Sequence, residues 1–114
     1  MSAAQFQAGN LIVFADCNNH QSGGKVSEMS SLYPLTDKWQ AFHWHVQRVD
    51  GHDIDALHLA LHAAKLQSDR PSLIACDTIK GKGIPYMEHN NAWHKRTPNE
   101  AELALARSAL EYTP

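Results

Sequence analysis

The feature that most restricts the fold of this chain is an alternation of short apolar runs with amphipathic stretches. Three runs have the length and composition of strands, at residues 11–15, 43–49 and 72–76. Three segments place apolar residues at helical spacing, at residues 34–42, 54–64 and 97–110. This order predicts an α/β fold, in which helices flank a parallel sheet and the crossovers are right-handed. With 114 residues, the chain has room for one domain.

Each expected helix carries a start signal. Thr36 is the candidate N-cap of the first helix, and Asp53 of the second. For the last helix, Thr97 and Glu100 have the spacing of a capping box, with Pro98 at the first helical position. In the second helix, residues 54, 57, 61 and 64 form an apolar stripe that is expected to pack against the sheet.

The loops after the first and third strands point to the site. The run at 11–15 is uninterrupted, which predicts a strand buried on both faces. Polar, glycine-containing segments follow it at 18–24 and follow the third strand at 77–83, and both are expected to be irregular. Parallel sheets bind ligands at the carboxyl ends of their strands, so we expect both loops at the binding edge.

Charge and composition exclude some classes of partner. Ten Lys and Arg against twelve Asp and Glu give a net charge of -2, which argues against nucleic acids and anionic membranes as partners. The apolar runs fall far short of the roughly 20 residues that span a bilayer. Cys17 follows closely on the expected strand 11–15 and Cys76 lies in the strand 72–76, and no signal segment opens the chain at Met1. We therefore expect a reduced, cytoplasmic protein.

Eight histidines are many for a chain of this length. Only His58 and His62 have the i,i+4 spacing of a helical metal site, and no histidine forms a zinc pattern with the cysteines. Surface or packing roles are the favoured interpretation of most of them. A histidine-rich metal-binding module stays an alternative hypothesis.

Three groups of residues could take part in chemistry. Asp16, Asn18 and Asn19 offer hard oxygen donors of the kind that bind Mg²⁺, although such residues are also common in turns. The segment 80–83 sets two lysines among glycines, which suits a diphosphate but also a surface turn. His94 can donate a hydrogen bond to a phosphate or shuttle a proton, and it can equally be a loop histidine without such a role.

Taken together, these segments resemble the thiamine-diphosphate-binding domain of transketolases, and specifically the N-terminal subunit of the split bacterial and archaeal type. The resemblance extends over almost the whole chain from Ala3. It is carried by the order and spacing of the segments 10–18, 34–39, 44–46, 50–53, 78–84 and 93–94.

The resemblance implies roles for four residues. Asn18 would bind Mg²⁺ through its amide oxygen, and His20 through its backbone carbonyl. Lys80 would hold the diphosphate of thiamine diphosphate, and His94 would face both cofactor and sugar as the catalytic histidine. The implied reaction transfers a two-carbon ketol unit between sugar phosphates, with the cofactor as electron sink.

The resemblance also implies that parts of the site lie elsewhere. The Gly-Asp-Gly that opens the family's Mg²⁺ motif is not found upstream of Asn18, so residues 1–114 are expected to be a partial domain that is inactive alone. The expected partner is a C-terminal transketolase subunit carrying the pyrimidine-binding domain. An open strand edge and an uncovered apolar face further predict a homo-oligomer. The alternative hypothesis is a non-catalytic, transketolase-like remnant that acts as an interaction module.

Overall fold

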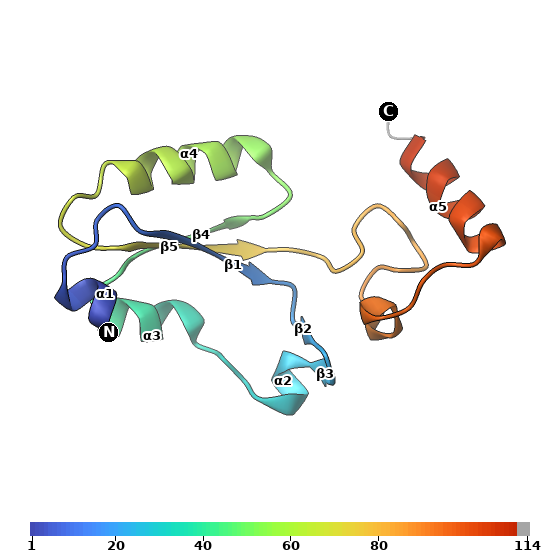
Figure 1. Cartoon of the computed structure of the whole chain (residues 1–114), viewed down its shortest axis with the longest axis horizontal. Coiled ribbons are helices and arrows are strands. Elements are labelled where there is room, and N and C mark those ends of the chain that lie inside the picture. The colour runs from blue at the N-terminus through green and yellow to red at the C-terminus, as the bar shows by residue number, and fades with distance from the viewer. Residues whose placement is uncertain (112–114) are drawn as a thin grey trace. The chain divides into compact units, whose positions relative to one another are not determined.

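The computed structural model describes residues 1–111, which form two compact units (Figure 1). The first unit contains residues 1–17 and 32–78. The second contains residues 18–31 and the chain from residue 79 onward. Each unit is described separately.

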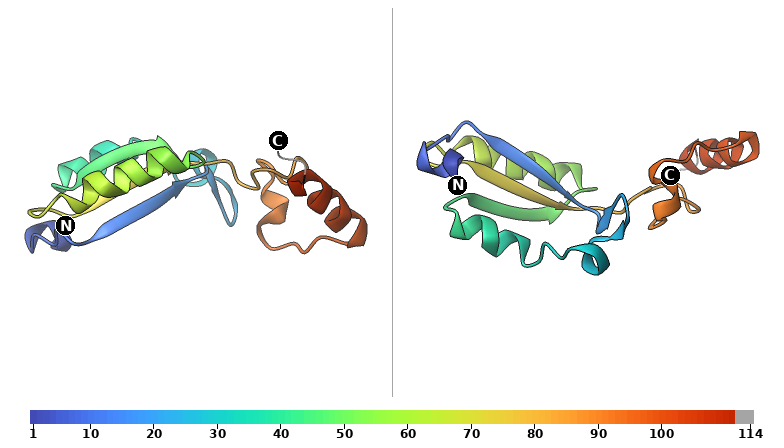
Figure 2. Two further views of the ribbon diagram at one scale, coloured as in Figure 1. Left: turned by 90° about the horizontal axis from the view of Figure 1, so that it is seen from above. Right: turned by 60° about the horizontal axis from the view of Figure 1, so that its bottom comes forward.

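A parallel sheet of three strands is the centre of the first unit, as the sequence predicted. Its strand order is β1 (Ile12–Cys17), β5 (Ser72–Asp77), β4 (His45–Asp50). Ser72 stands level with Ile12 on one side and with His45 on the other. Helix α4 (Ile54–Lys65) covers one face of the sheet, and α1 (Ser2–Gln5) and α3 (Leu35–Ala41) lie on the other (Figures 1 and 2).

The core of this unit lies between α4 and the central strand. Ile74 of β5 is fully buried, and Ala60 and Ala64 of α4 pack against it. The predicted helix stripe is therefore partly wrong: Ala64 belongs to it, but Ile54 is 74% exposed. The small side chains of the two alanines let the helix backbone approach the sheet, so the contact line runs through them.

Strand β1 is not buried on both faces, contrary to the prediction. Phe14 is 51% exposed, whereas β5 is buried from Ser72 to Cys76. Among the described strands, only β5 has a hydrogen-bonded neighbour on each side, while β1 is an edge strand. An apolar run of this length fits an edge and a centre equally well, so the sequence pattern alone could not assign it.

Of the two N-cap residues predicted for helices of the first unit, the structure confirms one. Asp53 caps α4, because its carboxylate accepts a hydrogen bond from the backbone nitrogen of Ala56 at 3.0 Å. Thr36 does not cap α3, which already begins one residue earlier. Its hydroxyl donates instead to the neighbouring Asp37 side chain.

The second unit consists of short elements and one longer helix. The segment predicted to be irregular contains a hairpin. The elements are β2 (His20–Gln21), β3 (Gly24–Lys25), α2 (Val26–Met29), the 3₁₀ helix η1 (Asn91–His94) and α5 (Glu100–Glu111). Throughout the described chain, no helix has both the length and the apolar character required to cross a membrane.

The predicted capping box of the last helix is displaced by two residues. Asn99 and Glu102 form it: the Asn99 side chain accepts from the Glu102 nitrogen, and the Glu102 carboxylate accepts from the Asn99 nitrogen, both at 2.9 Å. Thr97 and Glu100 have the same spacing, but α5 begins only at Glu100. Asn is at least as good a cap as Thr, so the box forms at the later pair.

Candidate functional site

The first loop is organised around the side chain of Asn18. Its amide oxygen accepts a hydrogen bond from the backbone nitrogen of His20 at 2.7 Å, which makes a tight Asx turn. Asn19 between them has a left-handed backbone with φ of 61°, a conformation that asparagine tolerates. The nitrogen of Val26 then donates to the Asn19 carbonyl at 2.9 Å. The turn therefore places the two predicted metal ligands, Asn18 and His20, next to one another.

His20 carries an unusual ring nitrogen. Nδ1 is shielded from solvent and has no hydrogen-bond partner among residues 1–111. Buried polar atoms are normally hydrogen-bonded, because leaving one unpaired costs free energy. The backbone of His20 belongs to the hairpin, while its side chain is half-buried.

The second loop needs its glycines for conformational reasons. Gly81 and Gly83 have φ of 76° and 90°, in the region that favours glycine. A Cβ on Gly81 would also lie 2.6 Å from the carbonyl oxygen of Met87, so no other residue fits there. The backbone conformation of the turn is therefore enough to explain why glycines alternate with lysines in this segment.

The backbone amides of this loop are directed inward. Lys82 donates to Ile79, and Ile84 donates to Gly81, both within the turn. The nitrogen of Gly83 donates to the Glu88 carboxylate at 3.0 Å. These three amides are therefore engaged within the protein and are not free to form a phosphate cradle. The carbonyl of Lys80 itself accepts from the nitrogen of His89 at 3.0 Å, which closes the loop at its base.

His94 is the last residue of η1 and lies beside the tip of the hairpin. Its Nε2 is 3.3 Å from the hydroxyl oxygen of Ser22. At the other end of η1, Asn90 caps the helix by accepting from the nitrogen of Ala92 at 3.0 Å. The structure thus supplies a bonded partner for His94 that the sequence pattern had not indicated.

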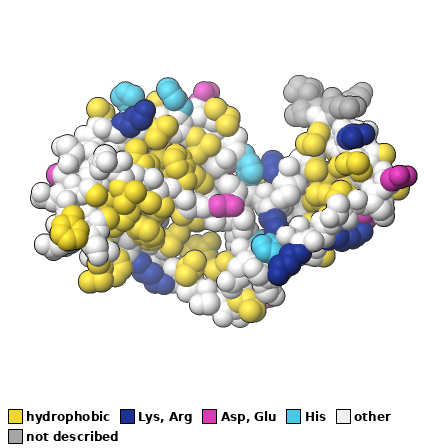
Figure 3. Space-filling model, viewed as in Figure 1, with side chains coloured by type: hydrophobic (Ala, Val, Ile, Leu, Met, Phe, Trp, Pro, Cys, Tyr) yellow, Lys and Arg dark blue, Asp and Glu magenta, His cyan; other side chains and the backbone are white. Residues whose placement is uncertain are grey.

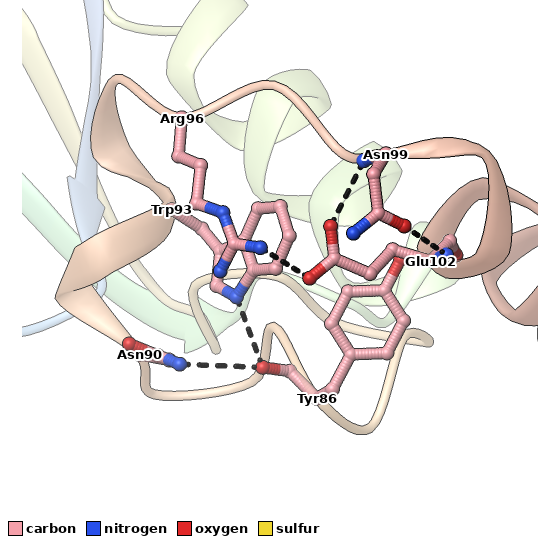
Figure 4. A network of polar contacts seen from close by, with 6 residues as sticks. All are labelled: Tyr86, Asn90, Trp93, Arg96, Asn99 and Glu102. Atoms are coloured by element: carbon pink, nitrogen blue, oxygen red, sulfur yellow. Dashed lines mark hydrogen bonds and ion pairs between the residues drawn. The ribbon is translucent and has the colours of Figure 1, made fainter.

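A network of polar contacts holds the segment around His94 to α5 (Figure 4). The indole nitrogen of Trp93 donates to the Tyr86 carbonyl at 3.1 Å, and the Tyr86 hydroxyl donates to the Glu102 carbonyl at 2.6 Å. The guanidinium of Arg96 lies 4.3 Å from the centre of the Trp93 ring and pairs with the Glu102 carboxylate. Trp93 therefore anchors the loop that carries His94.

The carboxylates at the end of the first unit's sheet are already engaged. Thr78 donates to Asp16. Arg48 makes two hydrogen bonds to Asp77, at 2.8 and 2.9 Å, and these lower the pKa of the Asp77 carboxyl below its usual value. Burial, followed by the nearby Asp77 charge, raises the pKa of the Cys17 thiol, so this cysteine is a poor nucleophile at neutral pH.

The described residues do not complete a metal centre. Asn18 and His20 offer neutral oxygens, whereas protein Mg²⁺ sites normally include one or two carboxylates. The aspartates of the chain all lie in the first unit, and of the glutamates in the second, Glu28 pairs with Lys25 and Glu102 with Arg96. No group of three or more His, Cys, Asp or Glu side chains that could hold a metal occurs within residues 1–111. The pair His58 and His62 on α4 therefore has no third ligand of these types among the described residues.

All four predicted site residues fall in the second unit. Asn18 contacts His20 directly, and His94 contacts the hairpin two residues beyond His20. Among the described residues no hydrogen bond or ion pair joins the Lys80 side chain to the other three. Sequence reasoning missed Ser22, which has no motif of its own and becomes visible only when the hairpin tip meets η1.

Comparison with known proteins identifies the fold and the family. The family described as "Transketolase, thiamine diphosphate binding domain" matches residues 1–114. The solved structure of transketolase from Campylobacter jejuni has a TM-score of 0.88 at 24% identity, covering 96% of this chain and 17% of that one. That likeness shows that the chain has the fold of part of a transketolase.

Curated relatives agree with this assignment. The 6-deoxy-6-sulfo-D-fructose transketolase subunit SqwG of Clostridium sp. is 42% identical over 113 residues, which are 96% of this chain and 41% of that protein. An apulose-4-phosphate transketolase subunit of Phocaeicola vulgatus is 32% identical over 106 residues, 93% of this chain and 38% of that one. The chain thus spans about two fifths of the length of these subunits. It belongs to the transketolase family and matches that family's thiamine-diphosphate-binding domain.

Proposed function

We propose that this chain helps to hold the diphosphate end of thiamine diphosphate in a transketolase reaction, together with further protein. The observation that carries the proposal is that Asn18, His20, Lys80 and His94 occupy one compact unit of a chain in this family. Three of them lie on, or are bonded to, the same hairpin segment. Residues distant in sequence are thereby brought to one part of the molecule.

Each side chain has a task that suits its chemistry. When bound, thiamine diphosphate supplies the nucleophilic carbon and the electron sink for ketol transfer. The Lys80 ammonium would neutralise diphosphate charge, since no ion pair engages it within residues 1–111. Asn18 and the carbonyl of His20 offer oxygens for a cation beside that diphosphate. His94 would donate to, or accept from, a hydroxyl of the sugar.

We further propose that this chain alone binds Mg²⁺ and thiamine diphosphate weakly. Asn18 and His20 offer only neutral oxygens to the metal, and no group of three or more His, Cys, Asp or Glu side chains within residues 1–111 is placed to hold it. Calorimetric titration with Mg²⁺ and thiamine diphosphate should show no saturation at micromolar ligand. A clear micromolar dissociation constant would contradict this proposal.

The proposed partner is a second transketolase subunit that carries the pyrimidine-binding domain. Support comes from the two relatives described above, because both are named as transketolase subunits, a word that implies a further chain. Their names also specify a sulfonated and a phosphorylated sugar as substrates of those proteins. We propose an anionic ketose of this kind, such as a sugar phosphate, as substrate here.

Exposed apolar side chains support the proposal of a homo-oligomer. Figure 3 shows hydrophobic side chains gathered over one face of the first unit. Phe6 is 81% exposed and Met1 78%. A pocket of about 410 Å³ in this unit is lined mainly by apolar residues, among them Met1, Leu32 and Phe42. Contiguous apolar surface of this kind is typical of interaction sites. Light scattering should show mass rising with concentration, and a constant monomer mass would contradict the proposal.

We also propose a reducing compartment, the cytoplasm, for this chain. Cys17 and Cys76 are both free thiols. Cys17 is level with Asp77, the residue after Cys76, so the two cysteines point to opposite faces of the sheet and cannot pair.

The test of the main proposal uses matched pairs of substitutions in the chain co-purified with its partner subunit. Lys80→Ala should lower the affinity for thiamine diphosphate about tenfold or more, because a charge-assisted contact is lost. Lys82→Ala, in the same loop, is the control. His94→Ala should lower ketol transfer, and His89→Asn, which keeps the left-handed backbone at that position, is its control. If Lys82→Ala lowered the affinity as much as Lys80→Ala, or His89→Asn lowered ketol transfer as much as His94→Ala, the assigned roles would be refuted.

The alternative is a non-catalytic interaction module. It would be favoured if the complex of both subunits bound thiamine diphosphate but transferred no ketol group from any sugar. The exposed apolar surface of the first unit is compatible with that alternative as well.

A further inference from the structure

Both ends of the short helix η1 are bonded to the same hairpin turn. At its first residue, Asn91 can orient its amide to donate to the Gln21 carbonyl at 3.1 Å and accept from the Gly24 nitrogen at 3.3 Å. At its last residue, Nε2 of His94 is 3.3 Å from the Ser22 hydroxyl oxygen. Residues three apart in a 3₁₀ helix lie on the same side of it. The helix therefore rests on the turn along one side, with His94 at the end.

The chemistry of the contact makes it independent of the charge on the histidine. A hydroxyl both donates and accepts, so Ser22 can donate to Nε2 of a neutral ring or accept from Nε2 of a charged one. The other ring nitrogen of His94, Nδ1, has no hydrogen-bond partner among residues 1–111. The ring is thus held at its Nε2 edge and open at its Nδ1 edge.

We propose that Ser22 is a positioning residue for His94. Its hydroxyl donates to the bare Nε2 of the neutral imidazole, which favours the tautomer with its proton on Nδ1 and presents that N–H to a bound ligand. The identity of that ligand rests on the proposed function, whereas the bond between the two side chains does not. The role requires a hydroxyl at position 22, and threonine should therefore replace serine.

The first arm of the test needs no ligand and no activity. Nitrogen-15 NMR of the histidine rings, in the full chain, measures the ratio of the two neutral tautomers of each ring. In Ser22→Ala, the His94 ratio should shift by about two- to fivefold toward the tautomer with its proton on Nε2, as expected for loss of one exposed hydrogen bond. The shift should be toward the ratio of His89, an exposed loop histidine whose ring makes no hydrogen bond among the described residues. Ser22→Thr and the control Ser27→Ala should keep the native ratio.

An unchanged His94 ratio in Ser22→Ala would overturn the proposal, as would an equal change in Ser27→Ala. Both serines are exposed, so their replacement is expected to leave the fold intact, and dispersed amide signals from β5 will verify it.

The second arm adds thiamine diphosphate and Mg²⁺ to the complex with the partner subunit. The proposal expects the Nδ1 signal of His94 to move more than the Nε2 signal, and the reverse would overturn it. If neither His94 signal moves, the proposed cofactor role of this unit is contradicted, and the tautomer comparison without ligand then decides alone whether Ser22 holds the ring.

Discussion

Replacement of Glu102 by alanine should loosen the start of α5 and the loop that carries His94. The Glu102 carboxylate accepts from the Asn99 nitrogen at 2.9 Å and pairs with Arg96. Arg96 in turn covers the Trp93 ring. One side chain therefore connects the helix cap to the residue that anchors the loop (Figure 4).

The size of the effect follows from these contacts. Loss of the capping hydrogen bond costs about 1 kcal/mol. The ion pair adds about 0.5 kcal/mol, because the Arg96 side chain is 48% exposed and solvent screens the pair. Partial loss of the stacking of Arg96 on Trp93 adds up to about 0.5 kcal/mol. The sum is about 1.5 to 2 kcal/mol, which corresponds to a roughly 10- to 30-fold change in the local opening equilibrium.

Amide hydrogen exchange measures this local opening equilibrium residue by residue along α5. Amides of residues 103–110 should exchange roughly 10 to 30 times faster in Glu102→Ala than in the native chain. Glu102→Gln keeps an acceptor for Asn99 but loses the ion pair, so it should show a smaller increase. Glu100→Ala is the control, since Glu100 lies in the same helical turn outside the capping box.

Two results would refute this reasoning. One is native exchange in Glu102→Ala. The other is an equal acceleration in Glu100→Ala, which would mean that the capping box belongs to the pair predicted from the sequence.

Three other predictions concern the first unit. Arg48→Met should lower the free energy of unfolding by about 0.5 to 1 kcal/mol at pH 7. Arg48 lowers the pKa of Asp77 in the folded state below the ordinary 3.8, so the ion pair stabilises the fold above that pH. The difference in unfolding free energy between the variant and the native chain should therefore vanish as the pH falls through the folded pKa of Asp77. Urea unfolding at a series of pH values measures this difference. Asp53→Ala should cost about 1 kcal/mol through the lost cap on Ala56, and Asp53→Ser should restore most of it in the same assay. Leu73→Ala should cost about 2 to 5 kcal/mol, since this side chain is fully buried, and a loss below 1 kcal/mol would show that the strand is not the core.

Some of the fold could be predicted because its cause is local. The alternation of apolar runs and amphipathic segments led to the parallel sheet, since strands and helices differ in the period of their buried residues. The cap at Asp53 was likewise predictable, because the residue and the amide it binds are three positions apart. The cap of the last helix was not, since two pairs had the same spacing and only the start of α5 distinguishes them.

The sequence by itself determined the α/β class, the order of the three sheet strands and three longer helices along the chain and, through resemblance, the family and four candidate residues. Only the tertiary structure decided that β5 is the central strand and β1 an edge, because pairing partners far apart in the chain set the burial of each strand. It also decided that the amides of Lys82, Gly83 and Ile84 are engaged within the second unit, and that His94 meets Ser22 across 72 positions of sequence. Contacts of that range depend on how the whole unit packs, and no local pattern of residue types encodes them.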